Sequence, residues 1–349
     1  MKATRIIAVF LAVVLIALSG GMSWAVASDY NARDVVMDGA TAAGVPGQTA
    51  VSLGGFTSDE AKAAIEDRIV RPLMEPLTVY TGVTGTYTID PAEFVTVDTV
   101  AMVRAAMAPG LAASVPERVA RRLAKKPIPV TIPLAMTIDK DKLEKWAVKL
   151  EAKIGRPAID STRSVSPEGK LTISDSHDGY STDHRLAYKL ALAALQSGKH
   201  ETKLKVGVIK PAVTASSWGK AIVVVRSQRH MWLYDGPKVI YNAPVAVGTP
   251  GHPTPLGVWR VIDKVKNPSW SNPHKAWSAS MPEYIPPGPS NPLGTRAIYL
   301  SADGIRFHGT NNTSSVGTAA SHGCMRMYRS NIEALYPLVP IGIDVFILR

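Results

Sequence analysis

The 349-residue chain is long enough for two or three domains, and its apolar fraction of 46% is ample for packed cores. Twenty-seven glycines and 26 prolines favour a protein of strands and loops over a helical bundle. The net charge of +11 indicates an anionic partner or surface, but the Lys and Arg residues are scattered and no nucleic-acid-binding motif is present, so nucleic acid is not expected as a partner.

The chain starts with a short basic segment, residues 1–5, which is followed by 22 residues without charge, 6–27. This pattern predicts export. Ala25-Val26-Ala27 before Ser28 resembles a signal-peptide cleavage site, whereas 22 uncharged residues are also enough to span a bilayer. Residues 1–27 are therefore expected to be a signal peptide or, if uncleaved, a membrane anchor. A lipoprotein is excluded because no cysteine lies near the start.

Residues 28–47 are expected to form a linker, and residues 48–212 an α+β module. The expected strands are 49–53, 77–80, 86–89, 130–138 and 171–173. Four helices are expected to begin after Thr57, Asp98, Asp139 and Asp183 and to run to about 69, 107, 154 and 195. Thr57 and Glu60 form a capping box, and Pro72 is expected to stop the first helix.

The order of these elements suggests an internal repeat. Arg71-Pro72 and Arg156-Pro157 lie 85 residues apart, and the helix starts match within a few residues. Residues 109–128, rich in Arg and Lys, are expected to join the halves as a solvated helix. A polar cluster at 175–178, which contains His177, is expected to be a turn between strands and not a metal site.

Residues 218–349 predict a second, mainly β domain. The expected strands are 221–225, 231–234, 239–247 and 342–348, and a helix is expected over 330–336. Short strands separated by turns indicate a sandwich or a barrel. The long segment 264–294 is rich in proline and aromatic residues, so it is expected to be an ordered lid that forms the groove for the substrate. No role is assigned to His230, His252 or His274.

Residues 306–328 contain the chemistry. They include Cys324, the only cysteine, and two of the eight histidines. A thiol becomes a good nucleophile when a nearby base removes its proton. His322 lies two residues before Cys324, where the backbone makes it hard to aim the ring at the sulfur, so we expect His308 to be the base and His322 to orient the loop or hold charge. The backbone N–H groups around Gly323 and Cys324 are expected to form an oxyanion hole.

Two other roles are considered for Cys324: a small buried hydrophobic residue and a zinc ligand. A lone cysteine is often a small buried hydrophobe, but the surrounding Ser-His-Gly-Cys is a polar turn. Zinc would need further ligands at regular spacing, and the sequence has no second cysteine and no His-x-x-x-His pair. A reactive thiol is therefore preferred, and no metal or other cofactor is expected.

The sequence resembles the L,D-transpeptidase catalytic domain (YkuD-type) over about residues 220–349. That family carries His-Gly, a gap of mid-teens length, and then Ser/Thr-His-Gly-Cys, a hydrophobic residue and Asn or Arg. Here these are His308-Gly309 and Ser321-His322-Gly323-Cys324-Met325-Arg326. The stretches at 253–257, 267–270 and 287–294 also resemble landmarks of the family.

The resemblance implies a fold, a set of roles and a substrate. The fold is a β-sandwich of mixed sheets, and the substrates are peptidoglycan stem peptides. By resemblance, Cys324 is the nucleophile, His308 accepts and donates the proton, and the Gly309 carbonyl orients that histidine. Arg326 is expected to bind a stem carboxylate. The remaining expected substrate-binding residues are Ser321, Met325 and Tyr328.

The implied reaction forms cross-links through a thioester. Cys324 would attack the third residue of a tetrapeptide stem, release D-alanine and pass the acyl group to an amine of a second stem. Carbapenems are expected to acylate the same thiol. The module before the catalytic domain resembles a peptidoglycan-binding module, which implies a spacer or wall-docking role outside the cytoplasm; the basic charge suits the cell wall better than DNA.

Two alternatives to cross-linking are open at this point. An L,D-carboxypeptidase would use the same thioester with water as acceptor, and the motif does not separate the two. A wall-binding protein with a decayed active site is disfavoured because His308, His322, Gly323 and Cys324 are all present. A papain-type peptidase is disfavoured because its cysteine precedes its histidine.

Overall fold

The computed structural model describes residues 2–349, apart from the side chains of residues 2–9 and 12. The chain divides into two compact units. Unit 1 comprises the residues up to Arg156 together with Tyr180–Val208, and unit 2 comprises Pro157–Gly179 together with Ile209–Arg349. The division into a module over 48–212 and a catalytic domain over 218–349 stays a prediction; the compact units differ from it at residues 157–179, which belong to unit 2.

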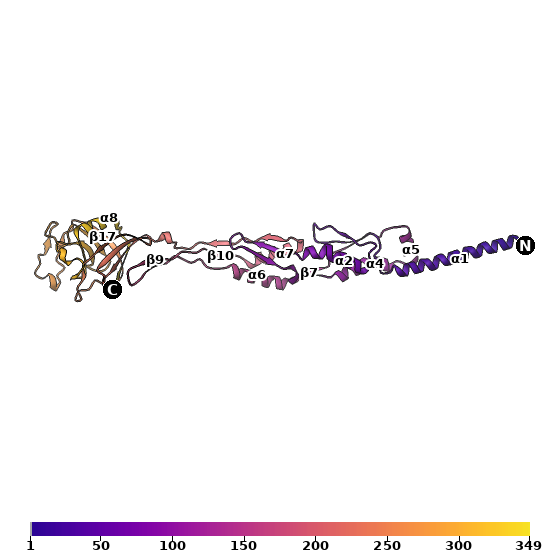
Figure 1. Cartoon of the computed structure of the whole chain (residues 1–349), viewed down its shortest axis with the longest axis horizontal. Helices are drawn as coiled ribbons and strands as arrows, with labels where there is room; N and C mark the ends of the chain where they lie inside the picture. The colour runs from indigo at the N-terminus through magenta and orange to yellow at the C-terminus, as the bar shows by residue number, and fades with distance from the viewer. Residues whose placement is uncertain (1) are drawn as a thin grey trace. The chain divides into compact units, whose positions relative to one another are not determined.

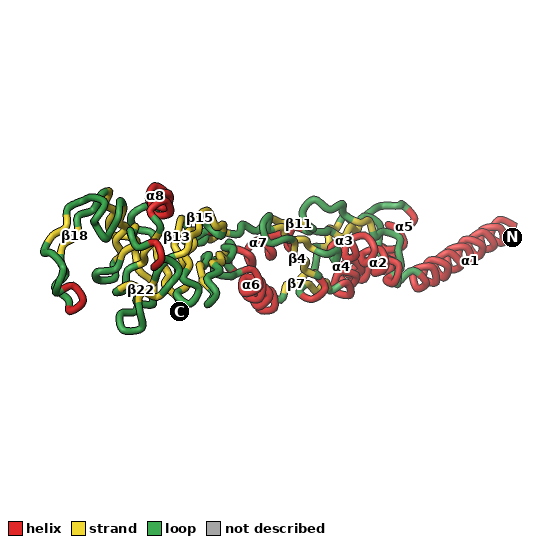
Figure 2. The backbone as a smooth tube through the Cα atoms, turned by 60° about the vertical axis from the view of Figure 1, so that its left-hand side comes forward, coloured by secondary structure: helices red, strands yellow, loops and turns green. Residues whose placement is uncertain are grey.

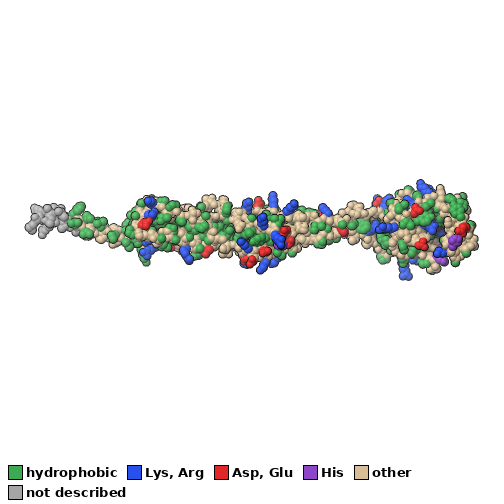
Figure 3. All heavy atoms as spheres, turned by 180° about the vertical axis from the view of Figure 1, so that it is seen from behind, with side chains coloured by type: hydrophobic (Ala, Val, Ile, Leu, Met, Phe, Trp, Pro, Cys, Tyr) green, Lys and Arg blue, Asp and Glu red, His purple; other side chains and the backbone are tan. Residues whose placement is uncertain are grey.

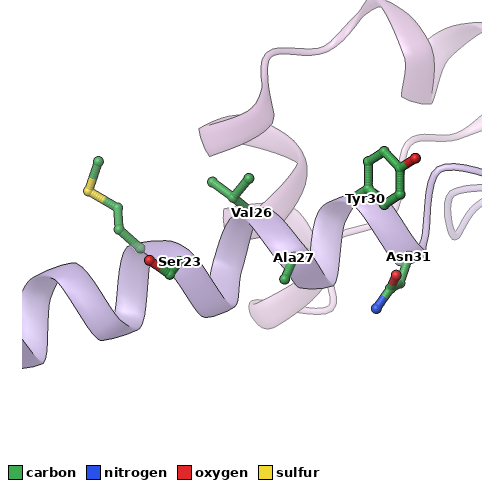
Figure 4. A pocket seen from close by; sticks show the side chains of 6 residues that line it. Ser23, Val26, Ala27, Tyr30 and Asn31 are labelled. Atoms are coloured by element: carbon green, nitrogen blue, oxygen red, sulfur yellow. The ribbon is translucent and has the colours of Figure 1, made fainter.

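The described chain begins with one long helix, α1 (Lys2–Asn31) (Figure 1). Its part Val13–Asn31 is long and apolar enough to cross a membrane, by length and composition alone. Figure 3 shows hydrophobic side chains along this helix. A hollow of about 580 Å³ lies beside it, and Figure 4 shows Val26 and Tyr30 on one side of the helix there. Because α1 alone lines this hollow, it is the open side of a helix and not an enclosed cavity.

The last turns of α1 pack against a second, basic helix, α5 (Val115–Leu123). The carboxylate of Asp29, 1% exposed, accepts hydrogen bonds from Arg118 at 2.9 and 2.6 Å and from Arg122 at 3.2 Å. Arg122 also donates to the Ala32 carbonyl at 2.6 Å. The basic segment expected to be solvated therefore holds the end of α1 through a buried ion pair.

Unit 1 is an α+β module with short strands. Its further helices are α2 (Ser58–Ile65), α3 (Arg71–Leu73), α4 (Thr99–Ala112), α6 (Lys140–Ile154) and α7 (His184–Ser197). Its strands are β1 (Ala40–Ala42), β2 (Val51–Ser52), β3 (Leu77–Tyr80), β4 (Thr86–Ile89), β5 (Val95–Val97), β6 (Val130–Ile132), β7 (Met136–Ile138), β10 (Gly179–Ser181), β11 (Glu201–Lys203) and β12 (Gly207–Ile209). Figure 2 shows the alternation of helix and strand.

Two hydrophobic cores lie in unit 1, each built around one pair of helices. One packs α2 and α4 against β1 and β6, and the other packs α6 and α7 against β3 and β4. The expected caps are confirmed: Thr57 and Glu60 form the capping box, and the carboxylates of Asp98, Asp139 and Asp183 accept from backbone N–H groups in the first turn. The internal repeat stays a prediction, because each core also contains strands of the other half: β6 lies in the first core, and β3 and β4 lie in the second.

Three further expectations in unit 1 are wrong. Residues 28–47 are not a linker, because they contain β1, and Val36, Ala40 and Ala42 are buried in one of the cores. Pro72 does not stop the first helix, because a π-helical segment, Glu66–Val70, precedes it and the helix continues as α3. A wider turn relieves the clash of a proline ring with the carbonyl four residues earlier. The strand expected over 130–138 is two strands, β6 and β7, which pair with different partners, β1 and β5.

Unit 2 is built on a mixed sheet of eight strands in the order β15-β14-β13-β24-β17-β20-β21-β23. The strands are β13 (Lys220–Val225), β14 (His230–Asp235), β15 (Lys238–Pro244), β17 (Gly257–Lys266), β20 (Arg296–Leu300), β21 (Arg306–Gly309), β23 (Met325–Met327) and β24 (Asp344–Leu348). The short β16 (Val247–Gly248) and β22 (Ala319–Ser321) pair in parallel beside it. The pairs β13–β24 and β21–β23 are parallel, so the sheet is mixed, as expected.

The main core of unit 2 lies between this sheet and α8 (Arg329–Leu338), which packs on β20 and β21 (Figure 1). Phe307 and Met325, on adjacent strands, are fully buried in it. Phe307 and His308 therefore alternate: one side chain of β21 enters the core and the next faces the opposite side. His308 therefore lies on the face of the sheet opposite to Phe307.

A hairpin from the middle of the chain covers the other face of the sheet. It consists of β8 (Arg163–Val165) and β9 (Leu171–Ile173), which pair antiparallel. Leu171 packs with Val223, Val225 and Tyr234 in a second core, and the Tyr234 hydroxyl donates to the Gly169 carbonyl at 2.9 Å. Because these contacts bury apolar side chains of β13, the hairpin is part of unit 2.

Candidate active site

His308 lies on β21 and is 5% exposed. Its Nδ1 lies 2.7 Å from the Gly309 carbonyl oxygen. A carbonyl can only accept, so Nδ1 carries the proton and donates it, which leaves the Nε2 lone pair free. The imidazole is thus held in the tautomer that a general base needs.

The charge state of His308 follows from its surroundings. Its pKa is lowered to about 4. Burial is the main cause and the charges of Arg306 and Arg326 add to it, while the backbone of Gly309 and of Pro292 opposes the shift. A neutral imidazole is therefore the stable form at neutral pH. The His308 imidazole can accept a proton during the reaction. Because its pKa is low, it gives the proton up again readily.

Cys324 stands immediately before β23, which pairs in parallel with β21 and brings Arg326 opposite His308. Cys324 is two residues from Arg326, so strand parity places its side chain on the same face as His308. The thiol is half-buried and donates to the Gly304 carbonyl at 3.2 Å. Over residues 2–349 no hydrogen bond joins the sulfur to either His308 or His322, and such bonds are often formed only in the substrate complex.

The turn before Cys324 is held by two buried hydroxyls. Ser321 Oγ donates to the Cys324 carbonyl at 2.6 Å and accepts from the Gly323 N–H at 3.2 Å. Thr254, 0% exposed, accepts from the Gly248 N–H at 2.9 Å and donates to the Gly323 carbonyl at 2.7 Å. Gly323 has a φ of +113°, which only glycine adopts readily, so this tight turn needs its glycine.

The oxyanion-hole expectation changes in one respect. The Gly323 N–H is engaged by Ser321 and is not free to bind an oxyanion. The Cys324 N–H makes no hydrogen bond within the part of the chain that the structure describes. Of the two N–H groups expected to form the oxyanion hole, only that of Cys324 is therefore free to bind an oxyanion.

Two guanidinium groups flank the pair. Arg306 Nη2 donates at 3.1 Å to Gly304, the same carbonyl that accepts from Cys324. Burial lowers the pKa of the Arg326 guanidinium from its ordinary value, and the nearby Cys324 opposes the shift. Neither arginine has a carboxylate partner among the described residues. Both cations can therefore serve an anionic group of a bound molecule.

His322 faces a long flap, residues 267–295, which leaves the sheet where Lys266 pairs with Arg296. The His322 ring stacks on Trp277 of the flap, with centroids 4.4 Å apart and planes at 11°, and meets His252 edge-on at 5.0 Å. Burial lowers the pKa of His322, and so do the charges of His252 and Arg326. His322 therefore joins the flap to the turn that carries Cys324.

The flap is ordered by its own hydrogen bonds. Asn291, 0% exposed, donates to the carbonyls of Pro268, Ile285 and Pro286 at 3.0–3.1 Å. Within the flap, β18 (Trp270–Ser271) pairs with β19 (Tyr284–Ile285). A loop closed in this way presents Trp277 from a fixed base.

Two family models match the chain. The model described as "L,D-transpeptidase catalytic domain" (YkuD) matches residues 219–347, and the one described as "Putative peptidoglycan binding domain" matches residues 87–203. The chain is also similar to the protein of Fuscovulum blasticum named "Putative L,D-transpeptidase in ATP synthase subunits region ORF 5", at 33% identity over 40% of this chain and 70% of that protein. The chain belongs to the L,D-transpeptidase family.

Other members of the family match over the catalytic domain. The chain is similar to the Escherichia coli K12 protein named "Probable L,D-transpeptidase ErfK/SrfK", at 31% identity over 37% of this chain, and spans only 44% of that protein. The solved catalytic domain from the Enterococcus faecium L,D-transpeptidase, acylated by ertapenem, aligns at 23% identity and a TM-score of 0.31 over 37% of this chain and 97% of that one. That alignment adds nothing to the family assignment.

Two of the residues expected to bind the substrate are buried. Met325 is wrong as a substrate-binding residue, because its side chain is 0% exposed in the core. Ser321 is 1% exposed and its hydroxyl is hydrogen-bonded within the turn. It therefore stabilises the turn and is not accessible to a substrate. Tyr328, 37% exposed, precedes α8 and is accessible. Arg326 and Cys324 lie together, as expected from their spacing.

Sequence reasoning missed three residues near the site. Thr254 holds the catalytic turn, Trp277 stacks on His322, and His252, to which no role was assigned, contacts the same ring. The signal for Thr254 was present, because it lies in a stretch that resembles a family landmark. No local pattern indicates the other two, which reach the site only through the fold.

One group of side chains in the described structure has the spacing of a metal site, and it lies in unit 1. It consists of Glu151, Asp183 and His184, whose ligand atoms are within 4.8 Å of one another. Each already has a partner: His184 pairs with Glu151 at 2.7 Å, and Asp183 caps α7. These contacts account for the group without an ion.

Proposed function

We propose that this protein is a peptidoglycan L,D-transpeptidase that works through a Cys324 thioester. The observation that carries the proposal is the register of β21 and β23. It pairs His308 with Arg326, two residues after Cys324, and His308 is neutral with its proton on Nδ1. Family membership supplies the reaction class. The geometry supplies a base, a nucleophile and a free N–H within one small region.

The first half-reaction transfers an acyl group to the enzyme. His308 Nε2 takes the thiol proton as Cys324 Sγ attacks the carbonyl of the third residue of a tetrapeptide stem. The Cys324 N–H stabilises the oxyanion. The bond to D-alanine breaks, His308 gives its proton to the departing amine, and a thioester remains.

The second half-reaction reverses these roles. A side-chain amine of another stem attacks the thioester and loses a proton to His308, which returns it to the Cys324 sulfur. The low pKa of His308, caused by burial, favours rapid return of the proton in both steps. This sequence of steps requires no metal.

The cations and the flap position the stem. Arg326 binds a stem carboxylate, because its guanidinium is half-buried beside Cys324 and has no carboxylate partner in residues 2–349. The flap closes over the donor through Trp277 and His322. Tyr328 is 37% exposed, so it is accessible to a substrate.

The test is turnover of purified disaccharide-tetrapeptides by the detergent-solubilised full chain, read by mass spectrometry. Cross-linked dimers and free D-alanine are expected. Cys324→Ala should abolish both, and His308→Gln should slow the reaction by about 10²–10⁴. His230→Gln, a histidine of the same unit distant in sequence from the motif, is the matched control and should keep full activity.

Other outcomes decide against the proposal. Tripeptide monomers without dimers would make the protein an L,D-carboxypeptidase, in which water accepts the acyl group. A chain that neither turns over nor forms an adduct with a carbapenem would be a non-catalytic wall-binding protein. Activity that survives Cys324→Ala would remove the thioester mechanism.

The N-terminal helix bears on location. The peptidoglycan-binding domain implies association with the cell wall. We infer that α1 is retained as a membrane anchor, because Ala27-Ser28 lies inside the helix and Asp29 is buried against Arg118 and Arg122. The intact mass of the protein recovered from membranes decides this: loss of residues 1–27 would show cleavage. Asp29→Asn should lower the melting temperature of unit 1, with Asp34→Asn as its control.

A further inference from the structure

The outer side of α6 and the neighbouring β4 form two adjoining hollows in unit 1. Their volumes are about 290 and 330 Å³, and they share Tyr87 and Lys153. We call this surface the α6 groove and define it by Tyr87, Trp146, Lys149, Lys153, Arg156 and Tyr180. Each hollow lies near the lower end of the range for small-molecule sites, about 300–1,000 Å³, so the groove suits a short stretch of a polymer.

The helical period explains why the groove has this lining. Trp146, Lys149 and Lys153 follow one another at three- and four-residue spacing and share one face of α6. The core residues Leu143, Ala147, Leu150 and Ile154 lie on an adjacent face. The acidic residues Glu144 and Glu151 fall on the far side, about 200° around the helix from Trp146 and Lys149. The charged side chains of α6 that line the groove are therefore all basic.

The cations in the groove are held over aromatic rings. Lys153 Nζ lies 5.4 Å from the centroid of Tyr87, and Arg156 Cζ lies 4.6 Å from that of Tyr180. These contacts hold two flexible side chains in place. Among the residues that the structure describes, neither they nor Lys149 pair with a carboxylate, whereas Glu151 is paired with His184 at 2.7 Å. Three cations are thus available to an anionic ligand.

We propose that the α6 groove binds an anionic glycopeptide segment of peptidoglycan. The carboxylates of a stem peptide would pair with Lys149, Lys153 and Arg156, and the apolar faces of the sugar rings would lie on Trp146, whose ring is half-buried and carries no cation. The proposal rests on peptidoglycan being the substrate of the proposed function. It adds a second site for that polymer, within the residues matched by the peptidoglycan-binding domain.

The combination of groups selects this ligand over a simple polyanion. A polyanion needs only charge, and surface cations elsewhere on the chain would serve as well. The α6 groove instead places rings and cations side by side in two hollows, which matches a polymer of sugars that carry charged peptides. Binding should therefore depend on Trp146 as well as on the charges.

The test is co-sedimentation of the detergent-solubilised full chain with purified, undigested peptidoglycan. All proteins carry Cys324→Ala, so that neither turnover nor a covalent adduct contributes. Lys149→Glu/Lys153→Glu and, separately, Trp146→Leu alter the groove. Lys140→Glu/Lys189→Glu is the matched control, because it makes the same change in charge at exposed positions of α6 and α7 that do not line the groove. Circular dichroism checks that each variant is folded.

The groove variants should bind about tenfold more weakly, and the control within about twofold of the parent. Soluble disaccharide-tetrapeptide should compete, whereas heparin at equal charge should compete poorly. An equal loss in both charge-reversed doubles, or equal competition by heparin, would show general adhesion of a basic protein and overturn the proposal. Unchanged binding in all variants would also overturn it.

A parallel assay separates this inference from the proposed function. The groove variants, with Cys324 intact, should turn over small soluble disaccharide-tetrapeptides at the rate of the unaltered protein. A chain without turnover whose binding to peptidoglycan still depends on the α6 groove would reject the enzymatic proposal alone. A chain with full turnover and no dependence on the groove would reject the groove alone.

Discussion

Replacing Thr254 by valine should weaken both the fold of unit 2 and the reaction. The Thr254 hydroxyl bridges the Gly248 N–H at 2.9 Å and the Gly323 carbonyl at 2.7 Å, and the residue is 0% exposed. Valine has the same shape but no hydroxyl, so it leaves two buried backbone groups without partners. At about 1–3 kcal/mol for each of these two groups, the free energy of unfolding should fall by about 2–6 kcal/mol.

This loss has two measurable consequences. The melting transition of unit 2, followed by calorimetry, should move down by about 4–24 °C, at about 2–4 °C per kcal/mol for a unit of this size. Acylation of Cys324 by a carbapenem, followed by intact mass, should slow by about tenfold or more, because Gly323 directly precedes the thiol and small misplacements of reacting groups are costly.

Thr254→Ser is the control for this prediction. It keeps the hydroxyl and removes one methyl group, so it should cost only about 1 kcal/mol and preserve acylation. The reasoning is refuted if valine is tolerated as well as serine. It is also refuted if both variants lose the same stability, because the methyl group and not the hydrogen bonds would then be responsible.

Three further predictions concern the base, its carbonyl partner and the flap. The pKa of His308 is lowered from 6.5 to about 4, so the folded state holds the ring neutral and loses stability as the pH falls from 6.5 towards 4, by about 3 kcal/mol at ~1.4 kcal/mol per unit; His308→Gln should remove this part of the pH dependence in urea titrations. Gly294→Ala should slow acylation, since Gly294 has a φ of +66° and a Cβ there would lie 3.0 Å from the backbone of Gly309, whose carbonyl holds the imidazole; an unchanged rate would contradict this. Trp277→Leu should lower the second-order rate of carbapenem acylation about two- to tenfold with little change in melting temperature, because it removes the ring stacked on His322; a large loss of stability would mean that the tryptophan is structural instead.

Local signals in the sequence were reliable where neighbours in the chain decide the structure. The carboxylates of Asp98, Asp139 and Asp183 cap their helices in the expected way, since a cap depends on three or four adjacent residues. The same holds for the strands over 77–80 and 86–89. The spacing of the histidines and the cysteine predicts the site, and that site stays a prediction.

Features set by contacts between distant segments could not be predicted. The stacking of Trp277 on His322 joins residues 45 positions apart through a flap that has no periodic pattern. The burial of Met325 follows from the register of β23 against β21, which the motif does not encode. The continuation of the first helix past Pro72 depends on a π-helical segment for which propensity gives no warning.

The hairpin of β8 and β9 has a practical consequence for handling this protein. Because the chain enters unit 2 at Pro157, leaves it after Gly179 and returns at Ile209, a fragment that begins at residue 218 lacks one layer of that unit. It would expose Val223, Val225 and Tyr234 to water and would tend to aggregate or self-associate. A protease cut between 209 and 217 would not release an intact catalytic half, since the hairpin would remain docked on the sheet and hold the two pieces together. Expression of the enzyme in isolation therefore requires residues 157–179 in the same polypeptide, for example joined by a short linker to residue 209.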